Sequence, residues 1–149
     1  MKNRIIIFLL AMMVLSSVDA DTTNVNVVIE GKNIDLNDSF RPKLVQRSID
    51  LLAGSAYMNA NPNWGAPTEP QTIADAKKEP HLHLVFSKPR KVEIPILNVA
   101  VKAQEMVITL PLKRAGIWVR TNNGVTYFAK FKPLDAESLQ KLLDSVQKL

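Results

Sequence analysis

Cysteine is absent from the 149 residues, and glycine occurs only five times beside nine prolines. The lack of cysteine excludes disulfide scaffolds, thiol enzymes, cysteine-ligated zinc sites and iron–sulfur clusters. The sequence also lacks the patterns of a nucleophile elbow, an H-E-x-x-H zinc site, a Walker loop, a dinucleotide fingerprint and a calcium-binding loop. No enzyme class is therefore favoured, and the sequence points to no catalytic residue and no cofactor.

The composition that remains is typical of a globular domain, with 46% apolar and 22% charged residues. The N-terminus differs from the rest, because Lys2 and Arg4 precede an apolar run that ends at Leu15 and a short exit of small and polar residues. This order is typical of a secretory signal peptide, with a cleavage site before Asp21. As a helix the apolar run spans only about 16 Å, whereas a bilayer core is roughly 30 Å thick, so a membrane anchor is the less favoured alternative.

We therefore expect residues 1–20 to be a cleaved signal peptide and residues 21–149 to form one exported domain. Nothing in residues 21–149 is long and apolar enough to predict a transmembrane segment. A cysteine-free exported chain is more typical of the bacterial periplasm than of eukaryotic secretion. The expected location is thus periplasmic or secreted.

The first half of this domain predicts one strand, one helix and a long irregular segment. Val25, Val27 and Ile29 alternate along the predicted strand. The helix that follows has Asp38 or Ser39 as its cap and Pro42 in its first turn. Its apolar residues recur at helical spacing, namely Val45, Ile49, Leu52 and Ala56, with Leu44 and Leu51 beside them. Residues 59–80 are rich in proline and predict an irregular crossing.

The second half alternates with a period of two and predicts several antiparallel strands. The apolar runs are Leu82 to Phe86, Val92 to Ile94, Leu97 to Ala103 and Met106 to Leu112, with breaks at 88–91, at Pro95 and at 104–105. A hairpin over 117–131 and an amphipathic helix over about 134–147 complete the chain. The predicted fold class is α+β, with an antiparallel sheet of about five or six strands and two amphipathic helices packed on one face.

The pairing of the hairpin can be predicted from its turn. A three-residue loop, Asn122-Asn123-Gly124, with Gly124 in the left-handed region places Ile117, Val119 and Thr121 on one apolar face with their partners. A two-residue loop would mix apolar and charged residues on both faces. The three-residue loop is therefore preferred, and it places Trp118 opposite Phe128 on the second face.

Two interpretations of that second face remain open. In the first, Trp118 and Phe128 are covered by the proline-rich crossing, and Arg120 and Lys130 lie at its edge. In the second, the rings form an exposed ligand-binding platform, and the two cations hold an acidic group.

Charge is concentrated on the strands. Residues 88–132 contain nine basic and two acidic side chains, a net charge of +7, whereas residues 21–87 carry −2 and residues 133–149 carry −1. A local excess of positive charge favours anionic partners such as lipid headgroups or acidic glycans, although a solvated basic surface also keeps a domain soluble. Nucleic acid is disfavoured, because no nucleic-acid-binding motif accompanies the charge.

His81 and His83 are the only histidines. In a strand they share one face roughly 7 Å apart, which is close enough to share a metal ion. Glu79 is near in sequence, but no third histidine and no cysteine exists to complete a zinc or copper site. A pair of ordinary surface or edge histidines is the simpler interpretation.

Together these patterns predict an exported, non-enzymatic binding or accessory protein. Its partner would be an anionic or amphipathic component of the envelope, such as a lipid, a glycan or a protein, bound by Trp118, Arg120, Phe128 and Lys130. The alternative is a periplasmic zinc- or copper-handling protein that uses His81 and His83.

Overall fold

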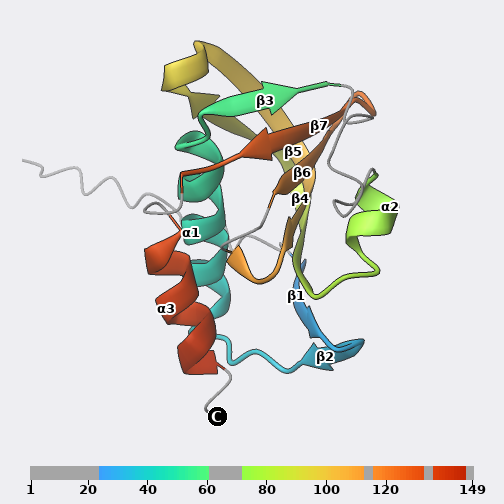
Figure 1. Cartoon of the computed structure of the whole chain (residues 1–149), viewed down its shortest axis with the longest axis vertical. Coiled ribbons are helices and arrows are strands. Elements are labelled where there is room, and N and C mark those ends of the chain that lie inside the picture. Colours follow the sequence, from blue (N-terminus) through green and yellow to red (C-terminus); the bar gives the residue numbers. More distant parts are fainter. Residues whose placement is uncertain (1–23, 61–71, 113–115, 133–135, 147–149) are drawn as a thin grey trace, which may run out of the picture.

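The computed structural model describes residues 24–60, 72–112, 116–132 and 136–146. Its seven strands form one antiparallel sheet in the order β2-β1-β4-β5-β6-β7-β3, with two sizeable helices beside it (Figure 1). The α+β class predicted from the sequence is confirmed, with seven strands rather than five or six. The elements are β1 (Asn24–Ile29), β2 (Lys32–Ile34), α1 (Arg41–Ala53), β3 (Tyr57–Asn59), α2 (Ile73–Ala76), β4 (His81–Ile94), the 3₁₀ turn η1 (Pro95–Leu97), β5 (Val99–Thr109), β6 (Ile117–Thr121), β7 (Thr126–Lys130) and α3 (Glu137–Val146).

Some predicted segments need correction, and some lie outside the described residues. Two predictions lie outside the described residues, namely the signal peptide at residues 1–20 and the part of the proline-rich crossing at residues 61–71. Within the crossing, the described residues include the end of β3 and all of α2, so it is not irregular throughout.

The predicted strand breaks at 88–91 and at 104–105 are wrong, because β4 and β5 run through them without interruption. Each supposed break coincides with a shift in strand pairing. The β4–β5 register shifts between Val85 and Arg90, and the β5–β6 register shifts between Ala103 and Glu105. A bulge of this kind leaves residues out of the hydrogen-bond ladder, which lets Pro89 sit inside a strand.

The helix α1 begins at Arg41 after Phe40, which makes no side-chain cap, so the predicted caps Asp38 and Ser39 are wrong. Pro42 does occupy the first turn, where its missing N–H costs no hydrogen bond. The helix ends at Ala53, before Ala56. Its buried face consists of Leu44, Val45, Ser48, Leu51 and Leu52. The predicted apolar stripe is confirmed in part, because Ser48 is buried while Ile49 is only partly buried and Ala56 is exposed.

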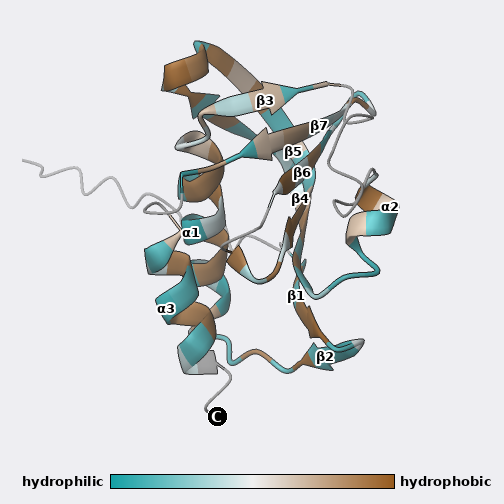
Figure 2. Ribbon diagram, in the orientation of Figure 1, coloured by the Kyte–Doolittle hydropathy of each residue, from teal (hydrophilic) through white to brown (hydrophobic). Residues whose placement is uncertain are grey.

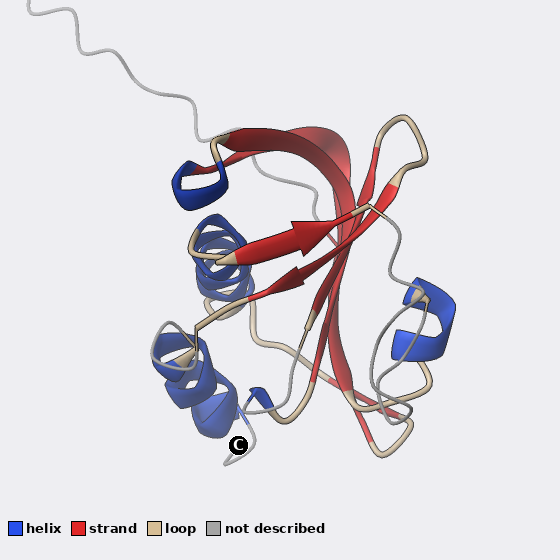
Figure 3. Ribbon diagram, turned by 45° about the horizontal axis from the view of Figure 1, so that its top comes forward, coloured by secondary structure: helices blue, strands red, loops and turns tan. Residues whose placement is uncertain are grey.

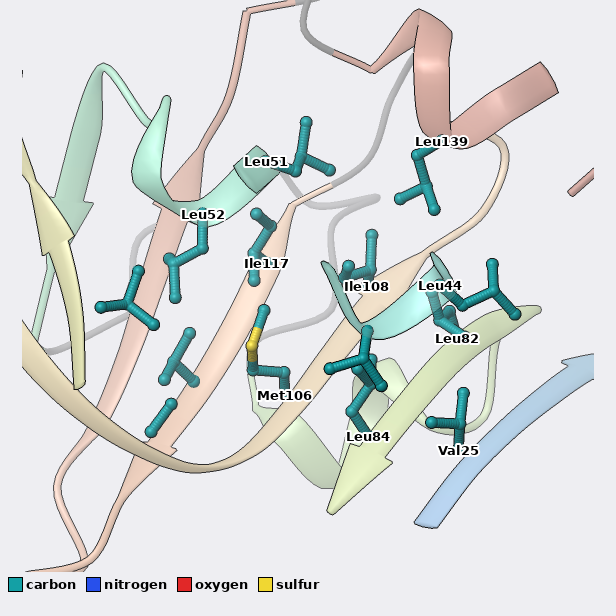
Figure 4. Close-up of a cluster of buried hydrophobic side chains, with 14 of the residues drawn as sticks. Val25, Leu44, Leu51, Leu52, Leu82, Leu84, Met106, Ile108, Ile117 and Leu139 are labelled. Atoms are coloured by element: carbon teal, nitrogen blue, oxygen red, sulfur yellow. The ribbon is translucent and has the colours of Figure 1, made fainter. Parts of the chain in front are cut away.

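The main hydrophobic core lies between the sheet and the pair α1 and α3. Leu84 on β4, Met106 on β5 and Ile117 on β6 are fully buried and face α1 in the same cluster (Figure 4). Leu139 from α3 closes the cluster from the other helix. The short helix α2 lies on the opposite side of the sheet from α1 and α3 (Figure 3). The sheet therefore buries side chains on both faces.

The predicted hairpin pairing is confirmed. Val119 pairs with Tyr127 and Trp118 pairs with Phe128, as a three-residue loop requires. The backbone N–H of Thr121 donates to the carbonyl of Val125 at 2.9 Å, and Gly124 has φ of 84°. The aromatic pair consequently points away from the main core.

Candidate functional site

The residues that the sequence singled out lie on one face of the sheet, which we call the outer face. It is the face turned away from α1 and α3, under α2. Strand pairing aligns a single row across it, with His83 on β4, then Val107, Trp118 and Phe128 on β5, β6 and β7. The structure thus brings together the histidines and the aromatic pair, which the sequence treated as two separate sites.

The aromatic pair is covered. Trp118 is 2% exposed and Phe128 is 6% exposed, and their ring centroids are 4.7 Å apart. Ala76 and Ile73 of α2 pack against them in a second, smaller core with Val107. The structure therefore agrees with the first interpretation of this face, in which the rings are covered by a part of the crossing. A ligand could stack on the rings only after α2 moved away.

The two cations of the predicted site lie at the surface beside this small core. The Lys130 ammonium lies 5.8 Å from the centroid of the Phe128 ring, within range of a cation–π interaction. The Arg120 guanidinium is about half exposed and pairs with Glu105. Arg120 follows Trp118 by two residues on β6 and Lys130 follows Phe128 by two residues on the antiparallel β7, so they flank the rings on opposite sides.

Glu105 is the central charged group of the outer face, and sequence analysis did not identify it as a site residue. Its side chain is only 3% exposed, and it pairs with Lys77 beside α2 and with Arg120 on β6. The neutral His83 ring donates its Nε2–H to the same carboxylate at 2.8 Å. A buried charge is tolerated when it is paired and hydrogen-bonded in this way. Glu105 therefore anchors the segment after α2 to the sheet.

The pKa values of the Glu105 and His83 side chains are both lowered. Burial raises the pKa of Glu105, but hydrogen bonds from Lys77 and His83 and the charges of Lys77 and Arg120 outweigh that effect. Burial is the main cause of the lowered pKa of His83, and the charges of Lys77 and His81 add to it, whereas Glu105 opposes it. At neutral pH the cluster therefore contains an ionised carboxylate, a neutral imidazole and two cations.

These directions predict that the free energy of unfolding falls as the pH is lowered from 7 toward 5. Unfolded His83 takes up a proton near pH 6.5, whereas folded His83 does so only at lower pH. Between these values the unfolded chain binds more protons, so acid favours unfolding. Glu105 acts in the same direction below its ordinary pKa of 4.5.

Urea unfolding of the wild type and of His83→Gln at a series of pH values measures this effect. Glutamine can still donate a hydrogen bond to Glu105 but does not titrate, so the slope between pH 6.5 and 5 should become shallower. The two proteins should differ little in slope above pH 7.5. An equally steep acid slope in the variant would contradict the assignment to His83.

The surroundings of the two histidines do not favour a metal site. Their ring centroids are 6.2 Å apart, and the Nδ1 atom of His81 makes a 2.6 Å hydrogen bond with the carbonyl of Glu79. Among the described residues no group of three histidine, aspartate or glutamate side chains is arranged to hold a metal ion. Lys77 and Arg120 beside Glu105 would also repel a metal cation.

The chain matches no protein family model, no curated protein and no solved structure. Within the described ranges, none of the helices has the length and apolar character needed to cross a bilayer. The fold and the site define an α+β sheet protein with an ion cluster beside α2 on its outer face.

Proposed function

We propose that the protein is an exported, non-enzymatic binding protein that meets an anionic partner through the basic part of its outer face. Lys91 and Lys102 are direct cross-strand partners on β4 and β5 and are both exposed. Two like charges directly opposite each other destabilise a sheet. Glu93 pairs with Lys91 and offsets part of this cost. An anionic partner that also neutralises Lys102 would convert the remaining cost into binding energy, and the Lys91–Lys102 pairing is the observation that carries the proposal.

Arg120 extends the same basic surface onto β6. It pairs with Glu105, and Lys102 precedes Glu105 by three residues across the β5 bulge. The backbone carbonyl of Lys102 accepts a hydrogen bond from Asn122 of the β6–β7 turn, which holds the two strands together at this point. Three neighbouring strands thus present one basic surface, defined by Lys91, Lys102 and Arg120.

The acidic groups of this region reduce the positive potential only in part. Within residues 88–132 the described part of the chain holds seven basic side chains and two acidic ones. Glu105 is buried among its own partners, and the exposed Glu93 pairs with Lys91 at 2.7 Å. Lys102 therefore faces solvent with little compensating charge, which supports binding of an anion there.

The partner surface proposed here differs from the one inferred from sequence. Trp118 and Phe128 support α2 and need not touch the partner, whereas Arg120 and Lys130 contribute surface charge. Placement outside the cytoplasm rests on the signal-like pattern of residues 1–20.

Binding to immobilised sulfated dextran over a range of salt concentrations tests the proposal. The double variant Lys91→Gln/Lys102→Gln should bind about tenfold more weakly at low salt and elute earlier, because two close charges are lost. The control Lys32→Gln/Lys43→Gln removes the same net charge from exposed positions on β2 and α1 and should bind like the wild type. Equal loss in both variants, or no retention of the wild type, would refute the proposal.

A further inference from the structure

The end of the β4–β5 hairpin is apolar and exposed. The large hydrophobic side chains that the described chain leaves exposed are Ile96 in η1, at 61%, and Val99 at the start of β5, at 44%. Pro95 and Ala100 beside them are exposed as well. The helical turn η1 stands out as a brown segment at the end of the hairpin (Figure 2). Single exposed apolar residues are common in proteins, but a cluster at a protruding end indicates an interaction site.

The conformation of this apolar tip, residues 95–100, is held by its own contacts. Leu97 points inward and packs against the main core. Asn98 adopts the left-handed region with φ of 52°, which asparagine tolerates better than most residues, and its N–H donates to the carbonyl of Pro95 at 3.1 Å. Ile96 is thus held outward by a formed turn, and binding through it requires little further ordering.

Basic side chains lie directly behind the apolar tip. Lys91 and Lys102 occupy the exposed side of the hairpin, and Lys88 and Arg90 lie further along β4. Three strand residues, or about 10 Å, separate Lys91 from Ile94 at the base of the tip. This spacing matches the step from the acyl boundary of a bilayer to its headgroups, and lysine can extend its ammonium group along that direction.

We propose that the apolar tip inserts into the surface of an anionic lipid bilayer while Lys91 and Lys102 contact the headgroups. This inference rests on the proposed function and names its partner. A glycan offers no hydrocarbon to cover Ile96 and Val99, and two side chains are too few for the core of a stable protein interface. A second copy of this chain would bring the same lysines against each other, which opposes self-association through the tip. An anionic lipid surface offers hydrocarbon for Ile96 and Val99 and negatively charged headgroups for Lys91 and Lys102.

The absence of cysteine makes a site-specific test straightforward. Ile96→Cys can be labelled with an environment-sensitive fluorophore, and Asn33→Cys on the exposed β2 provides the matched control. With vesicles of phosphatidylglycerol and phosphatidylcholine, the label at position 96 should shift to the blue and be quenched by brominated acyl chains. The label at position 33 should respond to neither, and vesicles of phosphatidylcholine alone should give a much weaker shift at position 96.

Affinity measurements with unlabelled protein distinguish failure of this inference from failure of the proposed function. Ile96→Thr/Val99→Thr should lower affinity for the anionic vesicles about tenfold and leave retention on sulfated dextran unchanged. Lys91→Gln/Lys102→Gln should lower vesicle affinity roughly thirtyfold and also weaken retention on dextran. All variants carry the same residues 1–20, so differences between them arise from the hairpin.

Three results would overturn the inference. The first is vesicle binding by the threonine variant equal to that of the wild type while dextran retention still depends on the lysines, which would leave the proposed function standing. The second is an Ile96 label that is not quenched in bound protein. The third is a dimer in solution that the threonine variant abolishes, which would assign the tip to a second copy. If the wild type binds neither the vesicles nor dextran, the proposed function is refuted as well.

Discussion

Glu105→Ala is expected to lower the free energy of unfolding by about 3 kcal/mol, because removing one partner of a buried charge cluster leaves the others without compensation. Lys77 would lose its contact with the sheet, and Arg120 and His83 would lose their shared acceptor. Arg120 and Lys77 can partly reach water, which is why the expected loss lies at the lower end for buried pairs. Chemical denaturation monitored by circular dichroism measures the change.

The local effect should reach the aromatic pair under α2. The indole N–H of Trp118 is buried and has no hydrogen-bond partner within the described residues, so its exchange with solvent depends on how firmly α2 covers it. In Glu105→Ala this indole proton should exchange faster in NMR spectra. The control Glu93→Ala removes an exposed carboxylate from the same hairpin and should leave both stability and exchange nearly unchanged. Equal effects of the two variants would contradict the anchoring role of Glu105.

The variant Gly116→Ala should cost about 2–3 kcal/mol of stability, because the added methyl group has no space. A Cβ atom at this position would overlap the edge of the Phe128 ring. The distance from this Cβ to the Cζ atom of Phe128 would be only 2.7 Å. Phe128 cannot move freely, because it packs against Trp118 in the small core. The backbone of Gly116 is also held by hydrogen bonds with Thr109, so relaxation of the chain there is limited.

A double variant and a second glycine separate steric overlap from backbone strain. Gly116→Ala/Phe128→Leu should recover part of the stability relative to the sum of the two single variants, since the shorter side chain vacates the ring edge. Gly124→Ala has open space around its Cβ but a φ of 84°, so it should cost only about 1 kcal/mol from the left-handed backbone. Additive losses in the double variant would show that Phe128 is not the obstacle.

The elements predicted well are those whose sequence patterns are long and local. Most of the buried face of α1 follows from helical spacing over 13 residues, with Ser48 as the residue that the apolar pattern missed. The β6–β7 pairing follows from the left-handed Gly124 and the period-two pattern on either side. The two missed strands, β2 and β3, have three residues each. Three residues are too few to show a period, and they form strands because longer neighbours at the sheet edges supply hydrogen-bond partners.

The site was predicted only in part, for a related reason. The sequence correctly indicated that Trp118 and Phe128 share a face, but it did not connect them with His83. His83 lies near the aromatic pair because β4 and β5 lie between β1 and β6 in the sheet. This strand order cannot be read from the local sequence pattern. Glu105 was missed because one acidic residue between apolar runs resembles a break, whereas the β5 bulge and Lys77 place it among three partners.

The sequence by itself determined the local features of the protein. These are the periods of the helices and the longer strands, the turn at Gly124 and the concentration of positive charge between residues 88 and 132. Tertiary structure alone decided which of these side chains meet water. Exposure depends on segments distant in sequence that arrive from another direction, as α2 does over Trp118 while no element covers Ile96 within the described chain. Burial is a property of three-dimensional proximity, and no local pattern encodes it.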